Sequence, residues 1–308
     1  MFLAPLDDLT DITDEFVRDP MQLAGIPLAV IGAVFLSVGA QLQHRGVTKV
    51  ESSRGGASSG LNLAQLTALL TRPSWVLGTV MLGLAIVFQL GALAFSPLII
   101  VQPLGAIALV LTAVINARAH SMRLNRASVR AIVACVGGVG LFVTVAALVA
   151  GEKPVTDSNL VVILGLLAVV LVVFGGAFAI GRHRTRAVFF IVAAGFIYGF
   201  VATLAKVIIN RVQNGNVEWL TILCGVALLA GTALGAYFVQ NAYSSGPPDL
   251  VIAGLTVIDP MVAIGIGIVV LGEAAGAPLW AVLGFIAAGL LAVWGVFQLA
   301  RHHPQLQN

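Results

Sequence analysis

Asp259 and Lys206 lie deep inside long apolar runs of this chain, where a charged side chain could bind an ion or carry a proton. Asp259 is ten residues beyond Asp249, or about 15 Å along a helix. Pro260 follows it and removes one helix hydrogen bond, which frees a carbonyl oxygen beside the carboxylate. Ionisable groups at membrane depth are costly and usually face a cavity or a partner. Asp259 and Pro260 are therefore a predicted proton or cation site; the alternative is a structural Asp259 that is protonated or paired.

Lys206 lies near the far end of its own run. Twenty residues separate it from Arg186, about 30 Å of helix. Its side chain either lines a transport path or extends to the outer lipid headgroups, as long basic side chains do near helix ends. Because Asp259 and Lys206 differ in depth by about 15 Å, no salt bridge between them is predicted.

Uncharged polar side chains in the apolar runs could line the same path, or could serve only as hydrogen bonds between helices. Glu273, in a loop on the outer side, is predicted at the outer mouth, where it gathers cations or is simply solvated. Two pairs of glycines four residues apart, 195 with 199 and 231 with 235, predict close helix packing. The path candidates are Asp259, Pro260, Tyr198, Thr203, Lys206, Gln89, Gln102, Gln240 and Asn241.

The composition requires lipid as the outer solvent. Of the 308 residues, 59% are hydrophobic and only 9% are charged, which is too little polar sequence to cover a water-soluble globule. Long apolar runs without alternation exclude a β-barrel, so the spans must be helices. Nine runs have the length of about 20 residues that a membrane crossing needs: 22–43, 74–95, 98–117, 128–150, 160–181, 187–209, 219–242, 250–271 and 278–300.

The positive charges predict the orientation of these spans, because cytoplasmic loops collect Lys and Arg. Nine spans put only Arg18, Lys153 and Arg211 on the other side, which is predicted to be extracytoplasmic. The chain is therefore predicted to sit in the plasma membrane with its N-terminus outside and its C-terminus in the cytoplasm. The cytoplasmic side receives Arg45, Lys49, Arg54, Arg72, Arg118, Arg123, Arg126, Arg130, Arg182, Arg184, Arg186 and Arg301.

Two tight turns indicate an internal inverted repeat. Spans 2 and 3 are joined by residues 94–97 and spans 7 and 8 by residues 244–248, and the sequences around Pro97 and Pro248 can be aligned. Repeats that start five spans apart lie upside down relative to each other, an architecture of secondary transporters. The predicted fold is all-α, with two inverted four-helix repeats at 22–150 and 187–300. A connecting span lies at 151–186, an acidic outer tail at 1–21 and a cytoplasmic tail at 301–308.

The segment from Asp259 to Glu273 resembles the proline, apolar run and Leu-Gly-Glu pattern of the drug/metabolite transporter superfamily. The nine-span layout is more similar to its NIPA-like magnesium-transporter branch than to the ten-span EamA branch. Ala92–Pro97, followed by Val101–Ala106, is similar to that branch's Ala-Pro and Val-Thr-Pro-Leu-Gly-Ala run, with Gln102 in place of the threonine. Lys206 also has a counterpart in the branch, whereas Asp259 has none.

The resemblance implies a secondary transporter that works by alternating access, with Mg²⁺ as a candidate substrate. A proton-coupled exporter of a small metabolite, drug or lipid-linked molecule is the first alternative, and a non-transporting membrane accessory protein is the second. No cluster of His, Asp or Cys suits membrane enzyme chemistry, so an enzyme is not predicted and no cofactor is expected. The expected partners are membrane lipids and the small-molecule or cation substrate, not nucleic acid; a homodimer is left open.

The orientation can be tested with single cysteines. Cysteines introduced into 152–158 should react with an impermeant thiol reagent added outside intact cells, whereas cysteines in 120–126 or 183–185 should not. Labelling of the 183–185 positions from outside would contradict the predicted topology.

Overall fold

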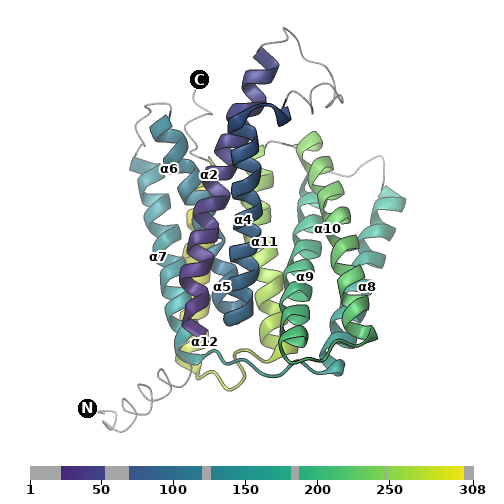
Figure 1. Ribbon diagram of the computed structural model, residues 1–308. Helices are drawn as coiled ribbons and strands as arrows, with labels where there is room; N and C mark the ends of the chain where they lie inside the picture. The colour runs from purple at the N-terminus through teal and green to yellow at the C-terminus, as the bar shows by residue number, and fades with distance from the viewer. Residues whose placement is uncertain (1–21, 53–68, 120–125, 182–186, 247, 302–308) are drawn as a thin grey trace, which may run out of the picture.

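The computed structural model describes residues 22–52, 69–119, 126–181, 187–246 and 248–301, and the regular elements in these ranges are all helical (Figure 1). The predicted tail at 1–21, most of the C-terminal tail and much of the basic loop sequence lie outside the described residues. The elements are η1 Gln22–Ala24, α2 Gly25–Ser52, α4 Pro73–Phe95, α5 Leu98–Leu104, α6 Ala106–Ala119, α7 Arg126–Val149, α8 Asp157–Gly181, α9 Ala187–Gln213, α10 Trp219–Ser245, α11 Pro248–Ile266, η2 Gly267–Leu271 and α12 Leu279–Arg301.

Within the described ranges, nine helical segments are long and apolar enough to cross a membrane. Their ends fall within a few residues of the predicted ones, and α5 with α6 forms the third span, as α11 with η2 forms the eighth. The predicted all-α polytopic class and the predicted count of spans are therefore confirmed.

Prolines and one glycine set the breaks between and within the spans. Pro73 lies in the first turn of α4, where the missing N–H is not needed. Pro97 separates α4 from α5, and Pro103 interrupts the third span just before Gly105. Gly272 ends the eighth span with φ of 69°, a left-handed conformation that glycine adopts without strain. The chain therefore turns sharply at Leu271-Gly272-Glu273.

The helix contacts are similar in the two predicted repeats. In each half the first two spans pair, α2 with α4 and α9 with α10, and the first also contacts the third, α2 with α6 and α9 with α11. The last spans of the halves, α7 and α12, pack against each other. The turn after α4 and the turn after α10 lie at opposite ends of the bundle, and α8 lies at its edge beside α10 (Figure 1). The domain boundaries themselves stay a prediction.

The predicted glycine contacts hold α9 close to its two neighbours. A Cβ atom on Gly195 would lie 2.6 Å from Cγ2 of Ile258 in α11, and one on Gly199 would lie 2.6 Å from Cβ of Val262. On the other side, a Cβ atom on Gly235 of α10 would lie 2.8 Å from a ring carbon of Tyr198. Both glycine pairs thus serve packing, and they place α9 directly against the segment of α11 that carries Asp259.

Gly199→Ala should therefore lower stability by about 1–3 kcal/mol, because the added methyl group has no space between α9 and α11. The readout is the thermal unfolding midpoint of the purified protein in detergent. Gly165→Ala in α8 is the matched control, since its Cβ would meet nothing within 4 Å, and it should be neutral or stabilising. Equal effects of the two substitutions would show that the contact is not tight.

Candidate functional site

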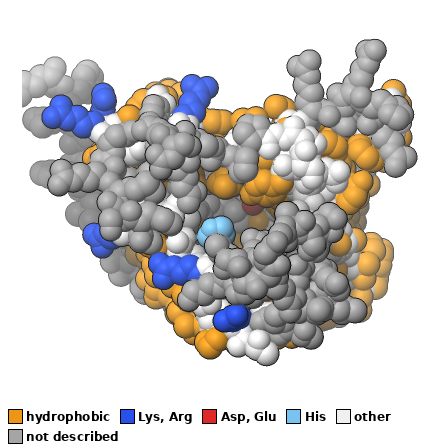
Figure 2. Space-filling view, turned by 90° about the horizontal axis from the view of Figure 1, so that it is seen from above, with side chains coloured by type: hydrophobic (Ala, Val, Ile, Leu, Met, Phe, Trp, Pro, Cys, Tyr) orange, Lys and Arg blue, Asp and Glu red, His pale blue; other side chains and the backbone are white. Residues whose placement is uncertain are grey.

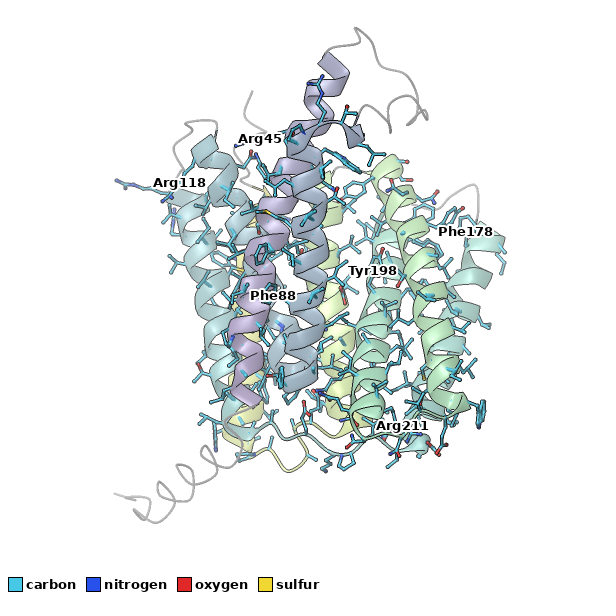
Figure 3. All side chains as sticks on the ribbon, in the orientation of Figure 1. Arg45, Phe88, Arg118, Phe178, Tyr198 and Arg211 are labelled. Carbon is cyan, nitrogen blue, oxygen red and sulfur yellow. The ribbon has the colours of Figure 1, made fainter. Side chains whose placement is uncertain are left out.

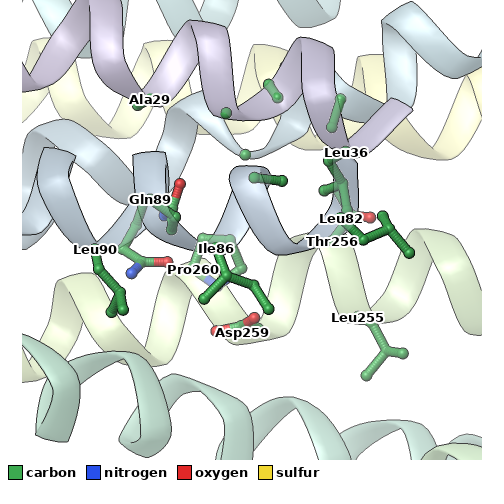
Figure 4. Close-up of a pocket in the computed structure, with 16 residues that line it drawn as sticks. Ala29, Leu36, Leu82, Ile86, Gln89, Leu90, Leu255, Thr256, Asp259 and Pro260 are labelled. Carbon is green, nitrogen blue, oxygen red and sulfur yellow. The ribbon is translucent and has the colours of Figure 1, made fainter. Parts of the chain in front are cut away.

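A cavity of about 590 Å³ lies between α2, α4, α11 and the junction of α5 with α6 (Figure 4). Its wall is mainly aliphatic, and the polar side chains in it are those of Gln89, Gln102, Thr256 and Asp259. No basic side chain lines it, so the single charge that the described residues give the cavity is the carboxylate of Asp259.

Asp259 forms no ion pair with the described residues. Its Oδ1 atom is buried and has no hydrogen-bond partner among the described residues. Pro260 has no N–H to donate to the carbonyl of Thr256 one turn earlier, so a second oxygen near the cavity lacks its helical partner. A buried carboxylate without a partner is costly unless it gains a proton or a cation. The site is therefore chemically suited to bind one or the other.

The third span is interrupted where it passes the cavity. Pro103 cannot donate to the carbonyl of Ile99, and Gly105, at the junction of α5 and α6, lines the cavity together with Gln102. Gly105 keeps helical dihedral angles, so the helix loses regular hydrogen bonds here without a sharp bend. Interrupted helices at mid-membrane cavities provide backbone oxygens for ions in secondary transporters.

The bundle is hollowed at the end where α12 finishes. Seen from that end, an acidic side chain is visible deep in the hollow, beside apolar side chains, and a histidine lies near the edge of the hollow in this view (Figure 2). Arg45 and Arg118 lie toward this end of the molecule, whereas Arg211 lies at the opposite end (Figure 3). By the predicted topology, the hollow end is the cytoplasmic one.

The structure brings together only part of the predicted path. Gln89, Gln102, Asp259 and Pro260 line the cavity. Tyr198 packs against Gly235 and is not among the residues that line the cavity.

Three further candidates are used in local hydrogen bonds or are exposed. The hydroxyl of the buried Thr203 donates to the carbonyl of Gly199, and the amide of Asn241 donates to the carbonyl of Tyr237. Gln240 is exposed. None of the three lines the cavity.

Lys206 does not extend to the headgroups; that alternative is wrong. The residue is only 4% exposed, and its ammonium group donates to the carbonyls of Leu93, at 2.8 Å, and Ser96, at 3.0 Å. It also forms an ion pair with Glu152. The carbonyl of Leu93 has no helical N–H partner, because the residue one turn later is Pro97, which has no N–H to donate. It is therefore available to accept from Lys206.

Glu273 is not solvated at an outer mouth, so this alternative is wrong too. The residue is 3% exposed, and its two carboxylate oxygens accept the backbone N–H groups of Leu98 and Ile99, each at 2.9 Å. These N–H groups begin α5, where the helix dipole favours a negative charge. Burial raises the pKa of Glu273 above its usual value, against the lowering effect of the two N–H groups and of Lys206.

Sequence reasoning missed how Lys206, Glu152 and Glu273 come together. Residues 152, 206 and 273 are far apart in the chain, and the residues around Glu152 do not indicate a buried partner. The signal was in the Leu-Gly-Glu motif, because the left-handed Gly272 turns the chain so that Glu273 reaches the start of α5. Among the described residues no three His, Cys, Asp or Glu side chains gather as metal ligands would.

Nine spans, packed as two halves around a cavity with a single carboxylate, define a polytopic membrane protein of the transporter class. A family model described as magnesium transporter NIPA matches residues 21–183, more than half of the chain. The chain therefore belongs to the NIPA magnesium transporter family. This family consists of membrane transporters and is not a class of enzymes. Membership of it supports the general assignment of the chain as a membrane cation transporter.

An uncharacterized protein of Corynebacterium glutamicum is 25% identical to the chain over 284 residues, which cover 91% of this chain and 95% of the relative. No solved structure matches the chain significantly. The matched region of the family model includes Gln89, Gln102 and Glu152, but Lys206, Asp259 and Glu273 lie beyond it.

Glu273 should make stability depend on pH. A carboxyl whose pKa is raised in the folded state holds its proton more tightly there, so the folded state loses stability as the pH rises from about 4.5 through the raised pKa. Glu273→Gln cannot titrate. The difference in thermal midpoint, wild type minus Glu273→Gln, should therefore decrease between pH 4.5 and neutrality. A difference that stays constant or grows over this range would contradict the direction of the shift.

Proposed function

We propose that the chain moves Mg²⁺ across the membrane by alternating access, with Asp259 as the binding carboxylate. The observation that carries the proposal is the buried, unpaired Oδ1 of Asp259 in a cavity without a basic side chain. Membership of the NIPA family supports a cation as the substrate.

A single carboxylate suits Mg²⁺ in a hydrated form. Mg²⁺ keeps several of its waters and is often bound through only one or two carboxylates. The cavity of about 590 Å³ has room for an ion with six waters, each of which takes about 30 Å³ in liquid water. The amide oxygens of Gln89 and Gln102 and the hydroxyl of Thr256 lie in the same wall and can accept hydrogen bonds from such waters.

A proton-coupled exporter of a small apolar molecule is the second candidate. The mainly aliphatic wall and the volume of the cavity are typical of sites for drug-sized ligands. In that case Asp259 would bind the coupling proton instead of the ion. The two functions differ in what must be supplied to the protein in liposomes, a Mg²⁺ gradient or a proton gradient.

Asp259→Asn should reduce Mg²⁺ flux at least about tenfold while the protein still folds, because the amide keeps the shape and removes the charge. The measurement is uptake by proteoliposomes that contain a Mg²⁺-sensitive dye. Glu218→Gln is the control, since Glu218 is an exposed carboxylate that does not line the cavity.

Normal Mg²⁺ flux in Asp259→Asn would remove Asp259 as the binding carboxylate. If the wild type gives no Mg²⁺ flux, but a proton gradient drives export of a small molecule and Asp259→Asn abolishes it, the second candidate is the correct one.

A further inference from the structure

The turn between α4 and α5 closes the cavity on the side away from the hollow end. Ala92, Leu93, Ser96 and the segment 98–101 are each at most 2% exposed, so they form a dry barrier, which we call the outer plug. The cavity reaches as far as Gln89 and Leu90 in α4 and Gln102 in α5, directly next to the plug. A solute in the cavity can reach the far side only if the plug moves.

Opposite charges from the second half of the chain hold the two helix ends of the plug. At the end of α4, the ammonium of Lys206 binds the carbonyls of Leu93 and Ser96. At the start of α5, the carboxylate of Glu273 binds two backbone N–H groups. Each charge lies where the helix dipole favours it, positive at a C-terminus and negative at an N-terminus.

We propose that Lys206 and Glu273 form a clamp that holds the outer plug closed, and that its release opens the cavity to the outer side. The clamp deepens the proposed transport function and rests on it. Lys206 lies on α9 and Glu273 follows η2, whereas the plug joins α4 to α5, so the clamp connects the two halves. Relative motion of the halves must break or rearrange these bonds.

Glu152 fits the same role. It comes from the loop between α7 and α8 and pairs with Lys206, which keeps the buried ammonium neutralised while the plug is closed. Gln213, near the end of α9, adds a bond of 3.2 Å to the carbonyl of Ala94 in the same turn. The clamp is therefore concentrated at one end of α9, about 18 Å along α11 and η2 from Asp259, counting the twelve residues from 259 to 271.

The test measures access to the cavity from the outer side. Thr256→Cys provides a thiol in the cavity wall, and the two buried cysteines of the chain, Cys135 and Cys224, are replaced by alanine. A cationic, membrane-impermeant methanethiosulfonate is added to the outer face of vesicles of known orientation. Lys206→Met keeps the length of the side chain and removes the charge, and it should raise the labelling rate about tenfold.

Tenfold corresponds to ~1.4 kcal/mol. Glu273→Gln should act in the same direction, because an amide offers only one acceptor oxygen to the two N–H groups. It serves as the second variant if Lys206→Met does not fold.

Arg211→Met is the matched control. Arg211 is also a buried cation at this end of α9, but it pairs with Asp157, at 2.6 Å, and Glu218, at 3.8 Å, and does not touch the plug. Its labelling rate should stay at the wild-type level. Wild-type rates in both clamp variants, or an equal increase in Arg211→Met, would overturn the proposal.

The test separates the clamp from the proposed function because labelling needs no transport. Faster labelling in Lys206→Met together with normal flux in Asp259→Asn would keep the clamp and reject Asp259 as the binding carboxylate. Unchanged labelling in the clamp variants together with lost flux in Asp259→Asn would reject the clamp and keep the carboxylate.

Discussion

A helix that ends inside a membrane protein leaves backbone groups that no water can satisfy, and this constraint governs the turn between α4 and α5. Pro97 makes the turn tight but removes the N–H that would have bonded the carbonyl of Leu93. The start of α5 leaves further N–H groups free. Lys206 and Glu273 supply the missing partners from the other half of the chain. The buried lysine and the left-handed turn at Gly272 both serve that need.

Charge is unpaired in the cavity, in contrast to the charges around the plug. Around the plug, buried charges are matched with backbone groups or with one another, whereas Asp259 has a buried oxygen without any partner among the described residues. Closely packed glycines on α9 fix the backbone of α11 next to Asp259. Leaving a charge unpaired costs stability. Such a cost is understandable at a place where a ligand supplies the partner.

Much of the fold could be read from the sequence, because apolar length and loop charge depend on neighbouring residues alone. The positions of the spans, and the close packing at Gly195 and Gly199, could be predicted from such local patterns. So could the place of Asp259 within its span, which follows from counting residues along one helix, and the structure puts this residue in the cavity wall. Depth alone did not tell whether Lys206 extends outward or turns into the protein. That depends on a carbonyl more than a hundred residues away, on another helix. Glu273 was misjudged because loop position was taken as exposure, and only the turn at Gly272 decides where its side chain goes.

The lone carboxylate also has an electrical consequence. A divalent cation bound to one ionised carboxylate forms a complex with a net charge of one, and no other charged side chain lines the described cavity to cancel it. Over a full transport cycle the carboxylate returns without the ion, so each Mg²⁺ carries its own two charges through the membrane field, which involves roughly 4.6 kcal/mol per 100 mV. Transport by the proposed mechanism is then electrogenic, so the membrane potential, negative inside in living cells, would itself drive a cation inward through this protein.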